Sequence, residues 1–334
     1  MVKTRPGLLS ASLEKTMKPK IKIFQDLGFS ANDIAEIISN DPYCLYRSAD
    51  NRFIPTLSVL KSLLGSSAEV AKVLKISGWY LKLDLKKTLV ANIEFLKSCG
   101  VDMEQIIKQI YNFPRFLLHS PTDMKKFVKK VDEMGTCRSS RLFIHAVRVV
   151  SSMTDENWEL KLKHFSELGF SKDDILKMFK KSPPAFAVSR RKLKEVKEVL
   201  LATGSDLGFP EDDILEMFKK SPPVFAVLQR KLKKVKEVLL ATGKYDLSCI
   251  VKDPASLLCS IEKKIKPRML VLGILDTRNF VKKLPSLAAI TRMPECKFLE
   301  KFVHPYLNEV GEAYMANSAL NSKSIIYLKE MGFK

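Results

Sequence analysis

The chain has 334 residues, with 57 Lys and Arg against 37 Asp and Glu, and therefore a formal net charge of +20. Apolar residues make up 46% of the sequence, which is typical of a folded protein and excludes a disordered chain. The longest uninterrupted apolar run, Met269–Leu275, contains a glycine and is far shorter than the roughly 20 residues of a membrane helix, so we expect no membrane contact.

A proline followed by a small apolar cluster recurs from one end of the chain to the other. These landmarks are Pro6, Pro42, Pro114, Pro184, Pro223, Pro254 and Pro285. The two widest gaps each have room for a degenerate copy, centred on residues 78–81 and 147–151. Pro6 and Pro285 are then separated by eight steps over 279 residues, about 35 residues each, which is the period of a helical-repeat protein.

Each repeat is predicted to contain two helices. The first helix begins at a serine followed three residues later by an aspartate, as at Ser30 with Asp33 and Ser171 with Asp174, a pattern typical of a capping box. The proline ends this helix, because its ring removes an N–H and clashes one turn back. A second amphipathic helix follows, such as residues 191–201. No segment shows sustained strand alternation, so we expect an all-α solenoid of two-helix repeats.

Two successive repeats are nearly the same. Residues 166–204 return as residues 205–243, and 31 of the 39 aligned positions are identical. A copied unit of this kind is tolerated where each repeat packs only on its neighbours. The repeated aromatic residues are expected to lie in the core, with base stacking as the alternative: Phe179, Phe186, Phe218 and Phe225.

The periodicity divides the chain into three parts. Residues 1–23 form a partial N-terminal repeat, because the sequence opens at the middle of a unit and we expect the first repeat to be cut. Residues 24–294 form the helical repeats and include the tandem copies. Residues 295–334 form a C-terminal cap and tail, since the period fades there.

Signatures of catalysis and of bound cofactors are absent from the sequence. It contains no phosphate-binding loop, no dinucleotide fingerprint, no zinc-protease motif and no nucleophile elbow. The six Cys include no CxxC pair, and the four His lie far apart. Adjacent acids such as Asp173 and Asp174 fall in a first helical turn, where capping explains them. We therefore expect no enzyme activity, no metal, no cofactor and no small-molecule substrate.

The basic residues carry the functional signal. On the second helix of one copy, Arg190, Lys194 and Lys197 share a flank beside the apolar stripe, and stacking of repeats would extend such a flank into a continuous positive track. Any single Lys or Arg is better explained as part of a solvated helix surface. For the whole set this explanation is weaker, because a surface that only confers solubility would carry balanced positive and negative charges. The candidate phosphate contacts are Arg47, Arg52, Arg115, Lys125, Lys126, Arg148, Arg190, Lys194, Lys197, Lys233, Lys236, Lys263, Lys264 and Arg268.

The repeat pattern resembles a known family. Residues 171–183 and 210–222 carry the pattern LGFS-x-x-D-I-L-x-M-F-x-x-S-P, before a helix with an S-x-x-K-L start, and residues 27–42 carry a looser form. Residues 253–268 resemble a penultimate repeat, and residues 298–303 resemble a C-terminal motif. Together these segments resemble the mitochondrial transcription termination factor (mTERF) family, most closely its land-plant organellar branch.

The resemblance implies a curved superhelix whose concave basic face binds double-stranded DNA, in the regulation or termination of transcription. RNA binding in intron splicing or ribosome biogenesis is the first alternative, and a protein-binding scaffold is the second. We expect duplex DNA over RNA, because base-per-repeat RNA readers use paired polar positions that these helices lack. The resemblance also implies a mitochondrial location, with the chloroplast as the alternative, and we expect a monomer.

Overall fold

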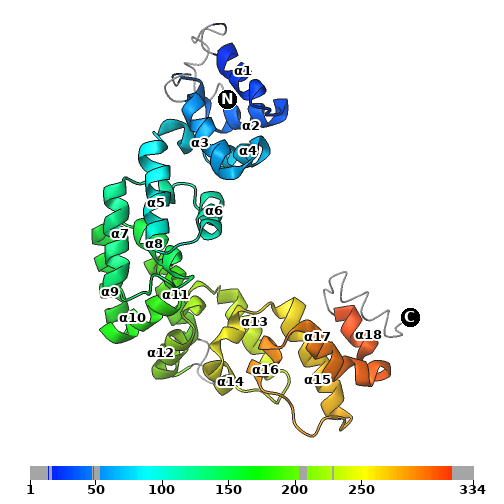
Figure 1. The fold of residues 1–334 in the computed structure, drawn as a ribbon. Coiled ribbons are helices and arrows are strands. Elements are labelled where there is room, and N and C mark those ends of the chain that lie inside the picture. Colours follow the sequence, from blue (N-terminus) through cyan, green and yellow to red (C-terminus); the bar gives the residue numbers. More distant parts are fainter. Residues whose placement is uncertain are drawn as a thin grey trace. The chain divides into compact units, whose positions relative to one another are not determined.

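The structure, a computed structural model, describes residues 14, 17–46, 48, 53–202, 209–227 and 229–317. These residues form helices and short turns, with no strand among them (Figure 1). The chain divides into two compact units, residues 1–158 and 159–334. No helix in the described ranges is long and apolar enough to cross a membrane. The predicted all-α repeat fold is confirmed, whereas the concave basic face stays a prediction.

The first unit alternates two sets of helices. Its first-type helices, which precede the landmark turns, are α2 (Ala31–Asn40), α4 (Ser67–Ile76), α6 (Met103–Asn112) and α8 (Phe143–Ser151). Its second-type helices are α1 (Lys18–Asp26), α3 (Ile54–Leu64), α5 (Ala91–Ser98) and α7 (Pro121–Glu133). Short 3₁₀ helices, η4 (Pro42–Tyr46), η6 (Gly78–Lys82) and η8 (Phe116–Leu118), join them, and a π-helical turn, η7 (Lys86–Val90), precedes α5. Neighbouring first-type helices pack on each other, α2 on α4 and α4 on α6.

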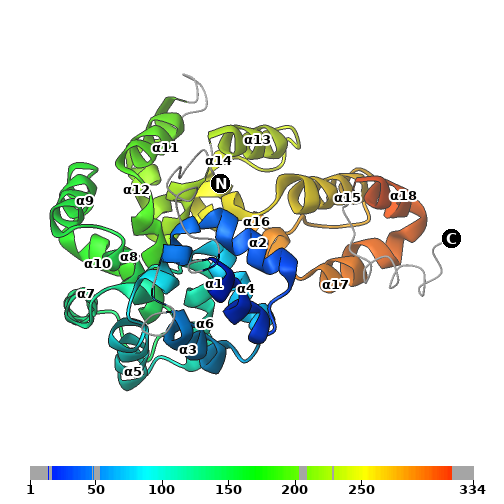
Figure 2. The same cartoon turned by 90° about the horizontal axis from the view of Figure 1, so that it is seen from above.

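The second unit repeats this plan after α9 (Asp155–Glu167), which spans the division between the units. Its first-type helices are α10 (Lys172–Lys181), α12 (Glu211–Lys220), α14 (Leu247–Lys252) and α16 (Leu287–Arg292), and its second-type helices are α11 (Arg190–Ala202), α13 (Gln229–Leu240) and α15 (Lys266–Thr277). The turns are η9 (Pro183–Ala187), η10 (Pro222–Ala226), η11 (Pro254–Leu258) and η12 (Ile261–Ile265). The unit closes with α17 (Glu295–Phe298), η13 (Leu299–Val303), η14 (His304–Tyr306) and α18 (Leu307–Asn317). Figure 2 shows α11, α13 and α15 following one another along one side of this unit.

The predicted capping signals lie at the helix starts. The Ser30 hydroxyl accepts a hydrogen bond from the Asp33 N–H at 3.1 Å, which satisfies a free donor of the first turn of α2. Ser171 and Asp174 form the full reciprocal capping box at α10. Gly169, in the Leu-Gly-Phe sequence between α9 and α10, has a φ of +95°, a left-handed conformation that glycine adopts without strain.

One landmark was read wrongly, and one degenerate copy differs from its prediction. Pro285 precedes a first-type helix rather than following one, because Ser286 caps α16 by accepting from the Ala289 N–H at 3.2 Å. The copy centred on residues 78–81 is confirmed as the 3₁₀ helix η6. Residues 147–151, in contrast, are the last turns of α8 itself. The predicted tail after residue 317 lies outside the described residues.

The duplicated repeats share one aromatic core. Phe179, Phe186, Phe218 and Phe225 are all at most 1% exposed, which confirms that they are core residues. Equivalent rings pair within each copy, Phe179 with Phe186 at 5.1 Å and Phe218 with Phe225 at 4.0 Å between ring centres. Across the copies, Lys219 of the second lies 3.6 Å from Asp174 of the first. The Lys181 ammonium of the first copy also donates to the carbonyl oxygen of Lys220, its equivalent in the second, so the two copies pack directly on each other.

Candidate nucleic-acid interface

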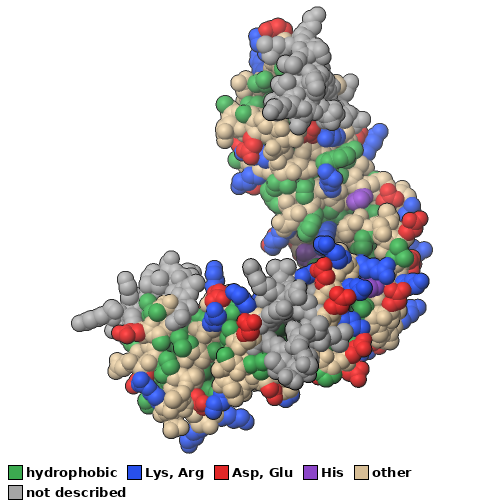
Figure 3. Space-filling view, turned by 180° about the vertical axis from the view of Figure 1, so that it is seen from behind, with side chains coloured by type: hydrophobic (Ala, Val, Ile, Leu, Met, Phe, Trp, Pro, Cys, Tyr) green, Lys and Arg blue, Asp and Glu red, His purple; other side chains and the backbone are tan. Residues whose placement is uncertain are grey.

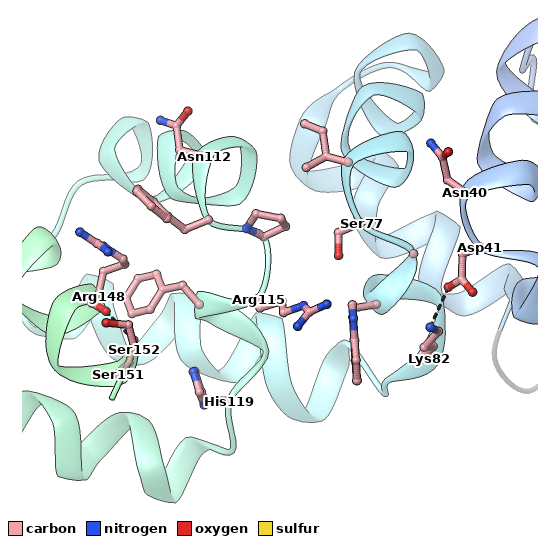
Figure 4. A pocket seen from close by; sticks show the side chains of 16 residues that line it. Asn40, Asp41, Ser77, Lys82, Asn112, Arg115, His119, Arg148, Ser151 and Ser152 are labelled. Carbon is pink, nitrogen blue, oxygen red and sulfur yellow. Dashed lines mark hydrogen bonds and ion pairs between the residues drawn. The ribbon is translucent and has the colours of Figure 1, made fainter. Parts of the chain in front are cut away.

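A groove of about 610 Å³ lies in the first unit, where the first-type helices end (Figure 4). Each of these helices stops at or just before its landmark turn, so the ends of α2, α4, α6 and α8 supply its walls one after another. The lining residues are Asn40, Asp41, Ile76, Ser77, Gly78, Trp79, Lys82, Asn112, Phe113, Pro114, Arg115, Phe116, His119, Arg148, Ser151 and Ser152. The repeat architecture thus brings together the same structural position from four successive repeats.

Two exposed aromatic rings in the groove are covered by cations. The Arg115 guanidinium carbon lies 4.8 Å from the centre of the Trp79 ring, and the Lys82 ammonium lies 5.0 Å from it. The Arg148 guanidinium carbon lies 4.3 Å from the centre of the Phe113 ring. Cation–π contacts of this kind contribute about 0.5–2 kcal/mol each. They hold the guanidinium groups in place at the groove without neutralising them.

The charges of the groove are not balanced. Lys82 is paired with Asp41, whose carboxylate lies 3.0 Å away. Among the described residues, neither Arg115 nor Arg148 forms an ion pair, in contrast to most cations of the neighbouring helices. Burial lowers the pKa of the half-buried Arg148, although an arginine remains charged at neutral pH. A partly desolvated cation without a counter-ion gains free energy when an anion binds beside it.

Apart from the Asp41 carboxylate that is paired with Lys82, two polar groups of the groove have no hydrogen-bond partner among the described residues. They are the Nε of Arg148 and the hydroxyl of Ser77, a side chain that is only 8% exposed. A buried polar atom left without a partner costs about 1–3 kcal/mol. Figure 4 shows the Ser77 side chain directed into the groove. The groove therefore offers positive charge to a ligand, whereas these two polar atoms are themselves buried beneath its surface.

Two histidines make the first unit sensitive to acid. Burial lowers the pKa of His119, and burial together with Arg148 lowers the pKa of His145. Since the unfolded chain binds these protons more readily, stability is lost as the pH falls below about 6.5. The melting temperature should decrease between pH 7.5 and pH 5.5 in thermal scans followed by circular dichroism. H119Q/H145Q should flatten that decrease, whereas substitution of the exposed His304 should leave it unchanged; equal slopes for both variants would contradict this origin.

Of the predicted phosphate contacts whose side chains the structure describes, two, Arg115 and Arg148, lie in the groove. Arg47 and Arg52 lie outside the described residues, as do the side chains of Lys233 and Lys236 on α13. Lys125 and Lys126 are exposed on α7, where Lys126 lies 3.5 Å from Asp123. Lys263 and Lys264 occupy η12, with Lys263 exposed and Lys264 half-buried.

The predicted flank of α11 carries ion pairs. Arg190 lies 3.8 Å from Glu167, Lys194 lies 3.7 Å from Glu198, and Lys197 pairs with Glu211. Figure 3 shows Lys and Arg side chains interspersed with Asp and Glu around α9 and α10. Exposed pairs of this kind are worth only about 0–1 kcal/mol, so a phosphate could displace these carboxylates. The three cations stay predicted contacts.

Arg268 is placed differently from its prediction. Its side chain is 1% exposed, and its guanidinium donates to the carbonyl oxygens of Ile290 at 2.6 Å and Met293 at 2.8 Å. It also forms an ion pair with Glu295 at 2.5 Å and lies over the Phe298 ring. Arg268 therefore joins α15 to α16 and α17, and it offers no exposed group to a phosphate.

Trp79, Lys82 and Phe113 line the groove but are not among the contacts predicted from the sequence. Phe113 is followed directly by Pro114, whereas the residues before the prolines that open other turns are Asp41, Ser182, Ser221 and Asp253. An aromatic residue at a position that holds serine or aspartate in these other repeats was a usable signal for the groove. Among the described residues there is also no cluster of His, Cys, Asp and Glu that could hold a metal ion.

Comparison with known proteins decides the family. The family model named mTERF matches residues 1–137, 123–206 and 201–299, which is most of the chain. The chain belongs to the mTERF family. Members of this family are helical-repeat regulators that bind nucleic acid, not enzymes. The mTERF chain is also similar to the transcription termination factor MTERF8, chloroplastic, of Arabidopsis thaliana, with 23% identity over 204 residues. That match covers 60% of this chain and 40% of the relative, so this chain spans well under two thirds of the relative.

Two lysines that are each followed by a leucine, Lys161 and Lys231, have a structural role in this mTERF chain. On α13, the Lys231 ammonium donates to the carbonyl oxygen of Leu258, at the end of the next repeat's turn, at 2.9 Å. Lys161 on α9 makes the equivalent bond to the Val188 carbonyl. Each such lysine satisfies a turn carbonyl and fixes the register between neighbouring mTERF repeats. Unlike Arg115 and Arg148, these two lysines are engaged in hydrogen bonds to backbone carbonyls within the fold.

Proposed function

We propose that the chain is an organellar regulator of gene expression that binds nucleic acid, and that the groove of the first unit supplies phosphate contacts through Arg115 and Arg148. One observation carries this proposal. The two arginines line a groove, lie over aromatic rings and have no carboxylate partner in the described structure. The net charge of +20 supports it, because a strongly basic chain attracts polyanions.

The biological role is proposed from the relative. The matched protein is named a transcription termination factor of the chloroplast, so we propose regulation of organellar transcription, including its termination. The chloroplast of that relative fits the alternative location, and the mitochondrion stays an expectation. Phosphate contacts hold duplex DNA, which the sequence favours, and RNA by the same electrostatic attraction. Selectivity between them has to come from other groups.

Removal of the two groove charges tests the proposal. In R115Q/R148Q two phosphate contacts are lost. The slope of the logarithm of the binding constant against the logarithm of the salt concentration should therefore become less steep by about 1.5, at 0.7–0.9 per contact. The measurement is fluorescence anisotropy of a labelled 30-nucleotide DNA or RNA, single-stranded and duplex, between 50 and 200 mM KCl.

The control removes the same charge elsewhere. Lys108 on α6 and Lys177 on α10 are exposed and each is paired with a glutamate or aspartate one turn away. K108Q/K177Q should therefore leave the slope within experimental error of the wild-type chain. An unchanged slope in R115Q/R148Q, or an equal decrease in both variants, would remove the groove from the interface.

A further inference from the structure

The aromatic rings of the groove are more exposed than aromatic residues of a folded core. Trp79 is 40% exposed and Phe113 is 38% exposed, whereas the aromatic residues of the duplicated repeats are almost fully buried. A tryptophan or phenylalanine ring offers a large apolar area, and leaving it in water forgoes the free energy of burial. Arg115 and Lys82 both lie over the Trp79 ring and Arg148 lies over the Phe113 ring, so a base that stacks on Trp79 takes the place of one of its two cations.

The dimensions and polarity of the groove restrict what can stack on these rings. A volume of about 610 Å³ is of the size that holds a drug-sized ligand. It therefore suits nucleobases and is too small for a duplex. The exposed amide of Asn112 lies at the same groove, where it can hydrogen-bond a base edge. A nucleotide matches these features, because it combines a base with planar apolar faces and polar edges and a negatively charged phosphate.

Base faces are accessible only when the strand is unpaired. In a duplex the faces of each base are covered by its neighbours. Aromatic side chains can then contact only the edges of the bases. Single-strand binding proteins instead combine basic groups along the backbone with aromatic side chains that stack on successive bases. We propose that this groove binds an unpaired nucleic-acid strand, with bases stacked on Trp79 and Phe113 and phosphates beside Arg115 and Arg148. This inference rests on the proposed function and specifies its ligand.

Trp79 itself can report the stacking. The chain contains two tryptophans, Trp79 and Trp158, and Trp158 is 3% exposed. In a Trp158→Phe chain, Trp79 is the one remaining tryptophan. The difference in emission between the wild-type chain and Trp79→Phe isolates the same signal without altering Trp158. The probes are a 12-nucleotide single strand, its duplex, and an abasic strand of equal length, each titrated while anisotropy reports binding.

The single strand should quench Trp79 emission as it binds, and the abasic strand and the duplex should bind without quenching. Binding of the single strand without quenching, or equal quenching by the duplex, would overturn the inference while leaving the phosphate contacts in place. Failure of all three probes to bind would reject the proposed function, and this inference with it. The outcomes for the two proposals are thus separate.

Substitutions give an independent readout. W79A should weaken binding of the single strand by about 5-fold to 100-fold, the effect of losing one base–aromatic stack, and F113A should behave alike. Affinity for the abasic strand should change less than twofold in both. The matched control is F280A, which removes an aromatic ring that is 42% exposed in the second unit, outside the groove. Equal weakening of the single and abasic strands would show that the rings only support the arginines and would overturn the stacking.

Discussion

Arg268→Ala should lower the free energy of unfolding of the second unit by about 3–5 kcal/mol, the usual effect of breaking a buried ion pair from one side. The guanidinium is 1% exposed and holds two carbonyl oxygens and the Glu295 carboxylate at once. Its removal takes this donor away from the two carbonyl oxygens and from one oxygen of the Glu295 carboxylate. Urea denaturation followed by circular dichroism at 222 nm measures the change.

The control for this variant is Lys263→Ala. Lys263 lies in η12, one turn before Arg268, and its side chain is exposed. We expect its substitution to change the free energy of unfolding by less than about 0.5 kcal/mol, as for most surface positions. If Arg268→Ala also costs less than 1 kcal/mol, the contacts between α15, α16 and α17 do not depend on this guanidinium.

Phe165→Ala should cost about 3–5 kcal/mol, the range for deleting a fully buried phenylalanine. Phe165 is 0% exposed, and its ring centre lies 4.6 Å from that of Phe186 and 5.5 Å from that of Phe225. It therefore joins α9 to both copies of the duplicated repeat. Truncation to alanine leaves a cavity that the neighbouring rigid rings cannot fill. The loss of unfolding free energy is measured from the shift in the urea midpoint, and we expect the dependence of this free energy on urea concentration to stay unchanged.

The same helix provides the control for Phe165. Leu160 on α9 is 58% exposed and apolar, so Leu160→Ala removes a side chain of similar character from the same element without opening a cavity. Its effect should stay within about 0.5 kcal/mol of zero. Equal losses for the two variants would indicate that α9 contributes helix stability alone and does not anchor the aromatic core.

Most of the fold could be predicted because its signals are local. Three of these signals act within one turn of the chain, and the structure confirms them. They are the capping box of Ser171 and Asp174, the glycine at residue 169 and the proline that follows most of the first helices. The degenerate turn at residues 78–82 could be placed because the period left room for it. Pro285 was misread because a proline before a capping serine starts a helix as readily as another proline ends one.

The interface was harder to predict, because it depends on pairing between distant residues. Whether a lysine is free or paired is set by neighbouring helices, as for Lys197 with Glu211. The burial of Arg268 likewise depends on α16 and α17, whose contact residues follow it by 22 and 27 residues. Arg115 and Arg148 were identified by their charge, but the two rings beneath them were not. An aromatic residue before the landmark proline was the local sign of that site.

Ultraviolet crosslinking tests the central claim most directly, because it locates bound nucleic acid on the chain without a substitution. The wild-type chain is irradiated with a single-stranded oligonucleotide at 100 mM KCl, digested, and its crosslinked peptides are identified by mass spectrometry. We expect the major crosslinks in the peptides that contain Trp79 and Phe113, and their loss above 500 mM KCl. Crosslinks confined to α11 and α13, around Lys194 and Lys197, would contradict the groove and place the binding surface on the second-type helices.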